Sequence, residues 1–227
     1  MFSGAGMSAE SGISTFRDSG GLWENYKIED VATPQAWLSD PDLVTNFYNH
    51  RRKNILETQP NEAHLAIAEL EKLTNVHVVT QNIDDLHERA GSNNVLHLHG
   101  NIRFAKSSGP DQEKVYYPIE GWELKANHLC EDGYRLRPHV VWFGEAVPSY
   151  DDAASVIDSA DIFIVIGTSL QVYPAAGLVN YARNAKMKFL IDPNANELNG
   201  LTDYIVYNKQ ATEGIKLAVE EIKKVIT

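Results

Sequence analysis

Short apolar runs alternate with stretches of helical periodicity along most of the chain. Met1–Ser3 ends a first apolar run, and later runs predict strands at Val76–Thr80, Val95–His99, Ile162–Gly167, Lys188–Ile191 and Tyr204–Tyr207. Helical spacing predicts helices between them at Asn61–Leu73, Ala153–Ser159, Ala175–Asn184 and Glu213–Ile226. Because parallel strands are buried on both faces, they are typically continuous apolar runs that alternate with helices. The pattern therefore predicts an α/β fold, a doubly wound Rossmann-like parallel sheet with helices on both faces.

Two stretches depart from this alternation. Residues 19–57 are helical and loop-like in character, with Pro41 at the expected start of a helix after Asp40. Residues 101–137 are polar and irregular, and rich in glycine, proline, lysine and glutamate. We interpret both stretches as a small second domain inserted into the first. The Rossmann-like domain would then comprise residues 1–18, 58–100 and 138–227.

Composition narrows the classes of protein that the chain can represent. The 227 residues are 43% hydrophobic and carry a formal net charge of −11, which disfavours nucleic-acid binding. The single cysteine, Cys130, excludes an internal disulfide. No apolar run approaches the length of a membrane span and no signal peptide is visible, so we expect a cytoplasmic protein without a membrane partner. The oligomeric state stays open, and a full first strand would need a few more residues before Met1.

A glycine-rich loop follows the first apolar run. Gly4, Gly6 and Ala9 fit the spacing G-x-G-x-x-G/A, in which small residues let backbone N–H groups approach a pyrophosphate. The loop continues into the polar segment Thr15–Asp18 rather than into an ordinary dehydrogenase βαβ unit. Taken alone, the spacing is also compatible with a simple turn between a strand and a helix.

Polar residues follow two of the predicted strands directly. Gln81, Asn82 and Asp84 come after one of them, at the sheet edge where ligands of open α/β sheets bind. His97 and His99 alternate with leucines, so both point to one face of the next strand. An imidazole with a near-neutral pKa can accept a proton at physiological pH, which makes His99 a candidate base. The alternatives are a turn with satisfied backbone groups and a purely structural histidine, and for His97 we expect a packing or orienting role.

The fourteen residues from Gly4 to Arg17 resemble the nucleotide-binding loop of the sirtuins, the NAD-dependent protein deacylases. Other segments are similar to sirtuin motifs and occur in the same order along nearly the whole chain. These segments are Gln81-Asn82-Ile83-Asp84, His99-Gly100, Arg137–Glu145, Gly167-Thr168-Ser169 and Asp192-Pro193-Asn194. Their shared order makes a chance match improbable.

The resemblance implies NAD as cofactor, acylated-lysine proteins or peptides as substrates, and nicotinamide and 2′-O-acyl-ADP-ribose as products. It gives His99 the role of base, Asn82 that of positioning the ribose and a water, and Asp84 that of holding the carboxamide. The residues that it implies in NAD binding are Gly4, Ala5, Gly6, Ser8, Ala9, Phe16, Arg17, Gln81, Asn82, Ile83, Asp84, His99, Gly167, Thr168, Ser169, Asn194 and Ala211.

The resemblance also implies a peptide-binding segment formed by Val141, Trp142, Phe143, Gly144 and Glu145, although the same run alone would be an ordinary core strand. Tyr48 and Arg51 lie three residues apart on a predicted helix and so share a face. A guanidinium suits a carboxylate, and the small Ala32 would leave room for a longer acyl chain. This combination is similar to sirtuins that remove succinyl and malonyl groups. Plain deacetylation, with Arg51 in solvent, is the alternative.

Most sirtuins hold a structural zinc with two Cys-x-x-Cys pairs, and this sequence has neither. We therefore predict no metal and expect Tyr116, Tyr117, Trp122 and Leu124 to hold residues 101–137 together. Two other functions stay open beside deacylation, namely mono-ADP-ribosyl transfer and NAD sensing without catalysis. The presence of His99 favours an enzyme over a sensor.

Overall fold

Six parallel strands form the main sheet of the computed structural model, which describes residues 1–14, 22–23, 26–125, 127–198 and 200–226. In spatial order the strands are β11 (Ile205–Tyr207), β10 (Met187–Ile191), β9 (Ile162–Ile166), β1 (Phe2–Ser3), β4 (Val78–Thr80) and β5 (Val95–His97). The chain runs outward from β1 to one edge, returns to β9 beside β1, and then runs to the other edge. This is the doubly wound strand order, and its switch point lies between β1 and β9.

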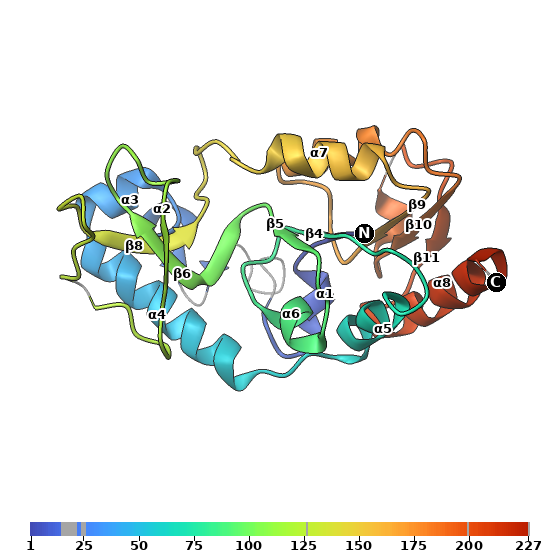
Figure 1. Cartoon of the computed structure of the whole chain (residues 1–227), viewed down its shortest axis with the longest axis horizontal. Helices are drawn as coiled ribbons and strands as arrows, with labels where there is room; N and C mark the ends of the chain where they lie inside the picture. The colour runs from blue at the N-terminus through green and yellow to red at the C-terminus, as the bar shows by residue number, and fades with distance from the viewer. Residues whose placement is uncertain (15–21, 24–25, 126, 199, 227) are drawn as a thin grey trace.

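Helices cover both faces of this sheet because successive strand residues point in opposite directions. In β9, Phe163 and Val165 pack against α7 (Tyr150–Asp158) and the 3₁₀ helix η1 (Ala175–Tyr181). Their neighbours Ile164 and Ile166 pack against α5 (Glu62–Leu70) and α8 (Ala211–Ile226) on the opposite face. Figure 1 shows α7 above the strands and the α5–α8 pair below them.

Each predicted strand of the main sheet is present, and several are shorter than expected. Val76 and His77 precede β4, and His99 lies beyond the end of β5. The helix expected at Ala175–Asn184 is instead a 3₁₀ helix that ends at Tyr181, and the last helix begins at Ala211 rather than Glu213. Short helices also follow three strands, namely α1 (Gly6–Ala9), α6 (Leu86–Ala90) and η2 (Ala195–Glu197).

The first of the two unusual stretches forms a helical layer at the left of Figure 1. It contains the hairpin β2 (Leu22–Trp23) and β3 (Tyr26–Lys27), followed by α2 (Ile28–Val31), α3 (Pro34–Ser39) and α4 (Pro41–Glu57). The predicted start of α4 is confirmed, because Asp40 accepts a hydrogen bond from the N–H of Leu43 and Pro41 occupies the first turn.

The irregular sequence of residues 101–137 left their structure open, and the structure shows that they contain strands. They contribute most of a three-stranded antiparallel sheet in the order β7 (Tyr116–Pro118), β6 (Gly100–Ser107) and β8 (Leu136–Val140). Its apolar core contains Leu124 with Tyr117 packed against it, as expected, whereas Tyr116 and Trp122 lie outside this core and are 43% and 41% exposed. The strands could not be recognised in the sequence because they contain charged residues. Lys106 of β6, for example, is buried and pairs with Glu113, with 2.6 Å between nitrogen and oxygen.

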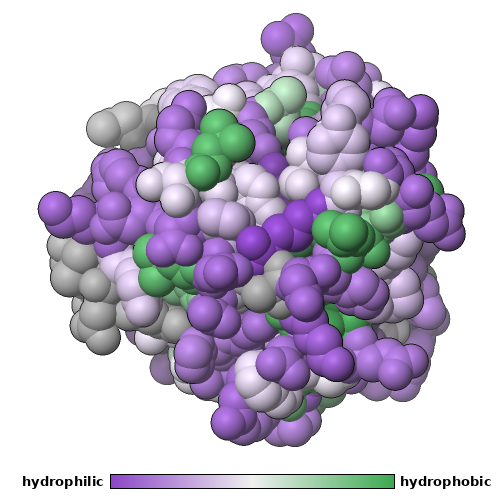
Figure 2. All heavy atoms as spheres, turned by 90° about the vertical axis from the view of Figure 1, so that its left-hand side faces the viewer, coloured by the Kyte–Doolittle hydropathy of each residue, from purple (hydrophilic) through white to green (hydrophobic). Residues whose placement is uncertain are grey.

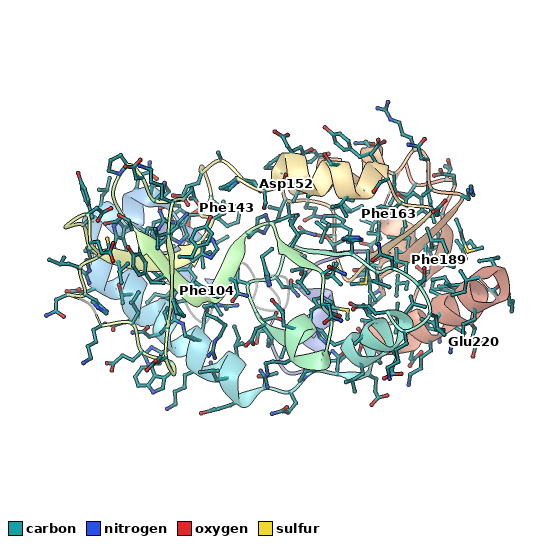
Figure 3. The ribbon with its side chains drawn as sticks, viewed as in Figure 1. Phe104, Phe143, Asp152, Phe163, Phe189 and Glu220 are labelled. Carbon is teal, nitrogen blue, oxygen red and sulfur yellow. The ribbon has the colours of Figure 1, made fainter. Side chains whose placement is uncertain are left out.

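The two parts of the molecule are recognisable by their separate apolar cores. Figure 3 shows Phe163 and Phe189 in the part with the parallel sheet, and Phe104 and Phe143 in the part with the antiparallel sheet. The outer face of the second part is mainly hydrophilic, with separate apolar side chains between polar ones (Figure 2). The exact domain boundaries stay a prediction. Among the described residues, no helix combines the length and the apolar character needed to cross a bilayer.

Candidate active site at the carboxyl edge of the sheet

The loops that follow β1 and β9 meet at the switch point of the sheet. The N–H of Gly4 donates to the carbonyl of Ile166 at 3.1 Å, and the N–H of Gly6 donates to that of Gly167 at 2.8 Å. A Cβ atom on Gly4 would lie 2.7 Å from Cβ of Thr168, and one on Gly167 would overlap the main-chain nitrogen of Met7. Gly167 also has a φ of +60°, which favours glycine. The glycines of both motifs are therefore required by close backbone packing.

Ser8, Asn82 and Asp84 form a buried polar group beside this loop. The hydroxyl of Ser8 donates to Oδ2 of Asp84 at 3.0 Å and accepts from Nδ2 of Asn82 at 3.0 Å. The other Asp84 oxygen accepts from the N–H of Leu86. Burial raises the pKa of Asp84, and these hydrogen bonds oppose the shift. Three predicted cofactor residues, one from α1 and two from the loop after β4, are thus brought together.

Gln81 joins the loops that follow β4 and β9. Its side-chain nitrogen donates to the hydroxyl of Thr168 at 2.9 Å. Ile83 is buried and packs with the apolar core of the second part, while Ser169 is half-buried beside Thr168. The predicted residues of both motifs therefore lie at one edge of the sheet.

His99 lies between the two sheets, after β5 and directly before Gly100 of β6. Its Nδ1 is 3.0 Å from the carbonyl oxygen of Gln81. Because a carbonyl can only accept, Nδ1 carries the proton and the neutral ring keeps Nε2 as its basic nitrogen. Burial lowers the pKa of His99, and the bond to Gln81 partly opposes this shift. A neutral imidazole with a free basic nitrogen can act as a general base.

The predicted substrate segment begins beside this histidine. The N–H of Val141 donates to the carbonyl of His99 at 2.9 Å. The N–H of Phe143 donates to the carbonyl of Ala32, which brings the small residue of the proposed acyl pocket to the same place. Val141 and Trp142 follow β8 rather than forming a strand, and Phe143 and Gly144 are exposed.

Trp142 connects the substrate segment to the buried face of α4. Its indole Nε1 donates to the hydroxyl of Tyr48 at 3.2 Å. Burial raises the pKa of Tyr48, and the charge of Arg51 partly opposes the rise. Arg51 is buried on the same helix, with its guanidinium carbon 5.9 Å from the ring centre of Phe47. The alternative of a solvated Arg51 therefore does not describe this structure.

Glu145 forms an ion pair with the buried side chain of Arg137. Its two oxygens accept from Arg137 at 2.7 and 2.9 Å, and one of them accepts from the N–H of Trp142 at 2.7 Å. The guanidinium of Arg137 also lies over the Trp142 ring, 3.3 Å from its centroid. This geometry gives Glu145 the role of holding the substrate segment in shape. A direct contact of Glu145 with substrate stays a prediction.

The remaining predicted cofactor residues lie further along the same edge or outside the described ranges. Asn194 follows β10, is exposed, and donates its N–H to the carboxylate of Asp192 at 2.9 Å. Ala211 is buried at the start of α8, and the next residue, Thr212, bonds to the carboxylate of Glu10 near the end of α1. The predicted roles of Phe16 and Arg17 lie outside the described residues.

The described residues contain no group of three or more histidine, cysteine or acidic side chains arranged to hold a metal ion. Cys130 instead donates its thiol to Asp132 at 2.7 Å and lies 2.9 Å from the carbonyl of Tyr134. Asp132 also accepts from the hydroxyl of Ser107. These bonds close the turn that follows Cys130, and the absence of a metal stays a prediction.

Sequence reasoning missed two parts of this site. The first is the contact of Trp142 with Tyr48, which joins residues 94 positions apart and leaves no local signal. The second is a network around His97, with Glu88 and Asn101, described below. The sequence did contain a signal for the network around His97. His97 and His99 share a face of their strand, which places both rings toward the same loop.

Comparisons with known proteins agree with this geometry. The Sir2 family profile matches residues 4–174. An NAD-dependent protein deacylase of Bacteroides thetaiotaomicron is 50% identical over 230 residues, covering 100% of this chain and 96% of the relative. A protein of the same name from Helicobacter pylori is 51% identical over 197 residues, covering 86% of this chain and 84% of the relative.

Two solved structures extend the comparison to the fold. The crystal structure of a Sir2 homologue–NAD complex has a TM-score of 0.86 at 40% identity, covering 100% of this chain and 89% of that one. A Sir2 homologue in complex with ADP-ribose has a TM-score of 0.87 at 39% identity, covering 99% and 91%. The chain belongs to the Sir2 family. The predicted family and fold class are confirmed.

Proposed function

We propose that the protein is an NAD-dependent protein-lysine deacylase that transfers an acyl group from lysine to ADP-ribose. The observation that carries the proposal is the placement of His99. Its side chain is held by the loop that bears Asn82 and Asp84, and its carbonyl is bound by the substrate segment at Val141. A base between a nucleotide site and a peptide site suits a reaction that joins the two.

The residues at the sheet edge fit NAD. Gly4 and Gly167 let the loops after β1 and β9 pack closely. A glycine-rich loop between a strand and a helix is suited to bring backbone N–H groups to a pyrophosphate. Ser8, Asn82 and Asp84 offer polar atoms beside that loop for a ribose and a carboxamide. When bound, NAD supplies the ADP-ribosyl group that accepts the acyl chain, with release of nicotinamide.

His99 is suited to accept a proton from a ribose hydroxyl. Its Nδ1–H is fixed on the carbonyl of Gln81, which orients Nε2 as the accepting nitrogen. Because burial lowers its pKa, the ring is neutral at physiological pH. Loss of this base through His99→Ala should abolish turnover while NAD binding, measured by calorimetry, is largely retained. Full activity of the variant would contradict the assignment.

We further propose that the enzyme removes succinyl and malonyl groups and also accepts acetyl groups. Tyr48 accepts a hydrogen bond from Trp142 and keeps its own proton for donation. Arg51 lies on the same face of α4, buried and close enough for its charge to act on Tyr48. A hydroxyl and a guanidinium together suit the terminal carboxylate of such an acyl chain. Plain deacetylation, mono-ADP-ribosyl transfer and NAD sensing are the alternatives.

The decisive experiment is mass spectrometry of one lysine peptide in its acetyl and succinyl forms, with and without NAD. Removal of succinyl faster than acetyl supports the whole proposal, and the reverse order discards the carboxylate pocket. Transfer of ADP-ribose to protein would favour mono-ADP-ribosyl transfer. If neither peptide changes while NAD binds, the sensing role becomes the better account.

Arg51→Met tests the pocket directly. Loss of one hydrogen bond to a charged group should reduce kcat/KM for the succinyl peptide by about 10–150-fold. The acetyl peptide has no terminal carboxylate, so its kcat/KM should change little and serves as the internal control. Equal losses on both peptides would remove the idea of a carboxylate contact.

A further inference from the structure

Two histidines bind consecutive carbonyls of the loop that carries Asn82 and Asp84. Nδ1 of His99 is 3.0 Å from the carbonyl oxygen of Gln81, and Nδ1 of His97 is 2.9 Å from that of Asn82. Both Nδ1 atoms must carry protons, because carbonyls only accept. The catalytic assignment uses only His99, and the packing or orienting role expected for His97 has so far had no stated target.

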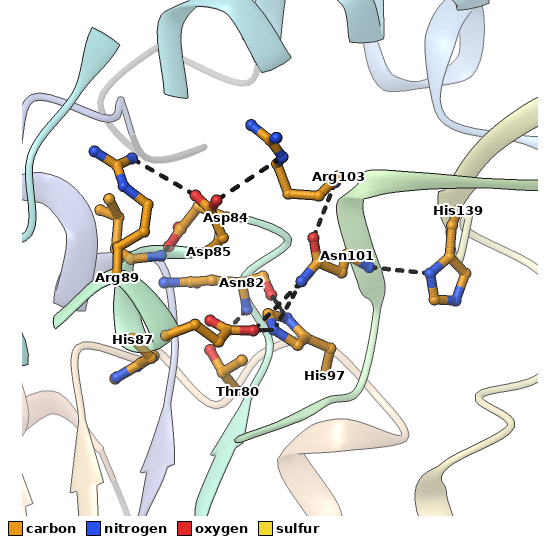
Figure 4. Close-up of polar contacts among 12 residues, drawn as sticks. Thr80, Asn82, Asp84, Asp85, His87, Arg89, His97, Asn101, Arg103 and His139 are labelled. Atoms are coloured by element: carbon orange, nitrogen blue, oxygen red, sulfur yellow. Dashed lines mark hydrogen bonds and ion pairs between the residues drawn. The ribbon is translucent and has the colours of Figure 1, made fainter. Parts of the chain in front are cut away.

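Asn82 is held by hydrogen bonds on its main chain as well as its side chain. Its N–H donates to the hydroxyl of Thr80 at 3.1 Å, its side chain donates to Ser8, and its carbonyl accepts from His97. Figure 4 shows His97 beneath Asn82, with its ring directed toward the loop. Removal of the carbonyl bond would free the main chain next to the group that positions the ribose.

Building on the proposed deacylase function, we propose that His97 is a positioning residue, which holds Asn82 in place by donating its Nδ1 proton to the Asn82 carbonyl. His97 has no contact with the reacting atoms in this account. It acts through the loop, in the way that outer hydrogen-bonding partners orient ligands in other enzyme sites.

The partners of the other ring nitrogen keep the proton on Nδ1. Nε2 of His97 is 2.8 Å from a carboxylate oxygen of Glu88 on α6 and 3.2 Å from the amide nitrogen of Asn101 on β6. A charged ring donates to Glu88, and a neutral ring can accept from Asn101. The side-chain oxygen of Asn101 accepts from the N–H of Arg103, which fixes the orientation of that amide. The Asn82 carbonyl therefore keeps its donor in either charge state of His97.

The surroundings of His97 favour the charged state. Burial alone would lower its pKa, but the hydrogen bond and charge of Glu88 raise it above the ordinary value. The other titratable groups whose charges act on this ring or respond to it are Asp84 after β4, His87 on α6 and His139 on β8. Asp84 favours the charged ring, and the two histidines have lowered pKa values and stay neutral near pH 7.

Two substitutions at one position separate the two ring nitrogens. In His97→Asn, the side-chain amide nitrogen can replace Nδ1 and keep a donor for the Asn82 carbonyl. In His97→Gln, the longer amide can replace Nε2 and reach Glu88 instead. Steady-state kinetics on the acyl peptide, with thermal melting of both variants, compares them directly.

We expect His97→Gln to lower kcat by about 100-fold, the effect of a misplaced catalytic group, with little change in KM for the peptide. We expect His97→Asn to retain at least ten times the kcat of His97→Gln at a similar melting temperature. Equal kcat values for the two variants, or losses that follow melting temperature alone, would overturn the proposal.

Asn101→Ala supplies a second test that does not alter His97. Without Asn101, a ring that deprotonates keeps its proton on Nε2 for Glu88, and Nδ1 then faces the Asn82 carbonyl with a lone pair. We expect kcat of Asn101→Ala to fall at alkaline pH where that of the wild type does not. Parallel pH profiles would contradict the proposal.

Failure of the proposed function gives a different result. In that case the wild type removes neither acyl group. The NAD affinities of the wild type, His97→Gln and His97→Asn then test the position of the loop alone. A weaker affinity for His97→Gln than for His97→Asn would support the role of His97, and equal affinities would overturn it.

Discussion

Glu145→Gln is expected to destabilise the protein although the residue lies in the predicted substrate segment. The substitution removes a negative charge whose oxygens accept two hydrogen bonds from Arg137 and one from the N–H of Trp142. The side chain of Arg137 is 5% exposed and that of Glu145 is 15% exposed. The glutamine would therefore leave a buried guanidinium without its counter-charge.

The size of the effect follows from this burial. Removal of one partner from a buried ion pair costs about 3–5 kcal/mol. Arg137 keeps the carbonyl of Val140 at 2.8 Å and the face of Trp142, so we expect the lower end, about 3 kcal/mol. For a chain of this size, that loss lowers the melting temperature by roughly 6–12 °C.

Thermal and urea unfolding followed by circular dichroism measure the change. Glu69→Gln is a matched control, because Glu69 pairs with Lys72 on the exposed surface and its loss should cost less than about 1 kcal/mol. The double variant Arg137→Met/Glu145→Gln should recover part of the stability, since no unpaired charge is left. A loss below about 1 kcal/mol for Glu145→Gln would refute the reasoning and favour a carboxylate free to bind substrate.

Other regions give further expectations. Gly167→Ala should lower the free energy of unfolding by at least about 1–3 kcal/mol in urea titrations, because φ is +60° and the new Cβ would overlap Met7; unchanged stability would contradict the packing of the two loops. Burial lowers the pKa of His64 to about 4. The free energy of unfolding should therefore be highest above about pH 6.5 and fall by up to about 3 kcal/mol as the pH falls toward 4. In a His64→Gln variant, the free energy of unfolding should depend less steeply on pH over this range. Zinc analysis should give less than one metal per chain and EDTA should leave the melting temperature unchanged, whereas one tightly held zinc would show that the turn around Cys130 had been misread.

The centre of the main sheet was predictable because its inner strands, such as β4 and β9, are buried on both faces. Ile162–Ile166 is a continuous apolar run, and a run of this kind can only be placed in the interior. The antiparallel sheet was not predictable in the same way, since β6 contains Arg103 and Lys106. Lys106 becomes compatible with burial only through Glu113, which comes from a different loop.

In the candidate site, too, some features were predictable from the sequence and others depend on contacts between distant parts of the chain. Gln81, Asn82 and Asp84 were placed correctly at the sheet edge because they directly follow a buried strand. The support for Tyr48 was not visible, because Trp142 reaches it from another part of the chain. The sequence likewise could not reveal the ion pair between Arg137 and Glu145. This pair forms only because of the way the chain turns from β8 into the substrate segment.

The main-chain bond between His99 and Val141 separates two properties of the enzyme. The proposed base is fixed by carbonyl and N–H groups, which every residue except proline provides, while the proposed acyl pocket would be formed by the side chains of Ala32, Tyr48 and Arg51. Substitutions in the pocket can therefore change which acyl group is accepted while the base keeps its position. Divergence in substrate choice within such a scaffold needs no redesign of its chemistry.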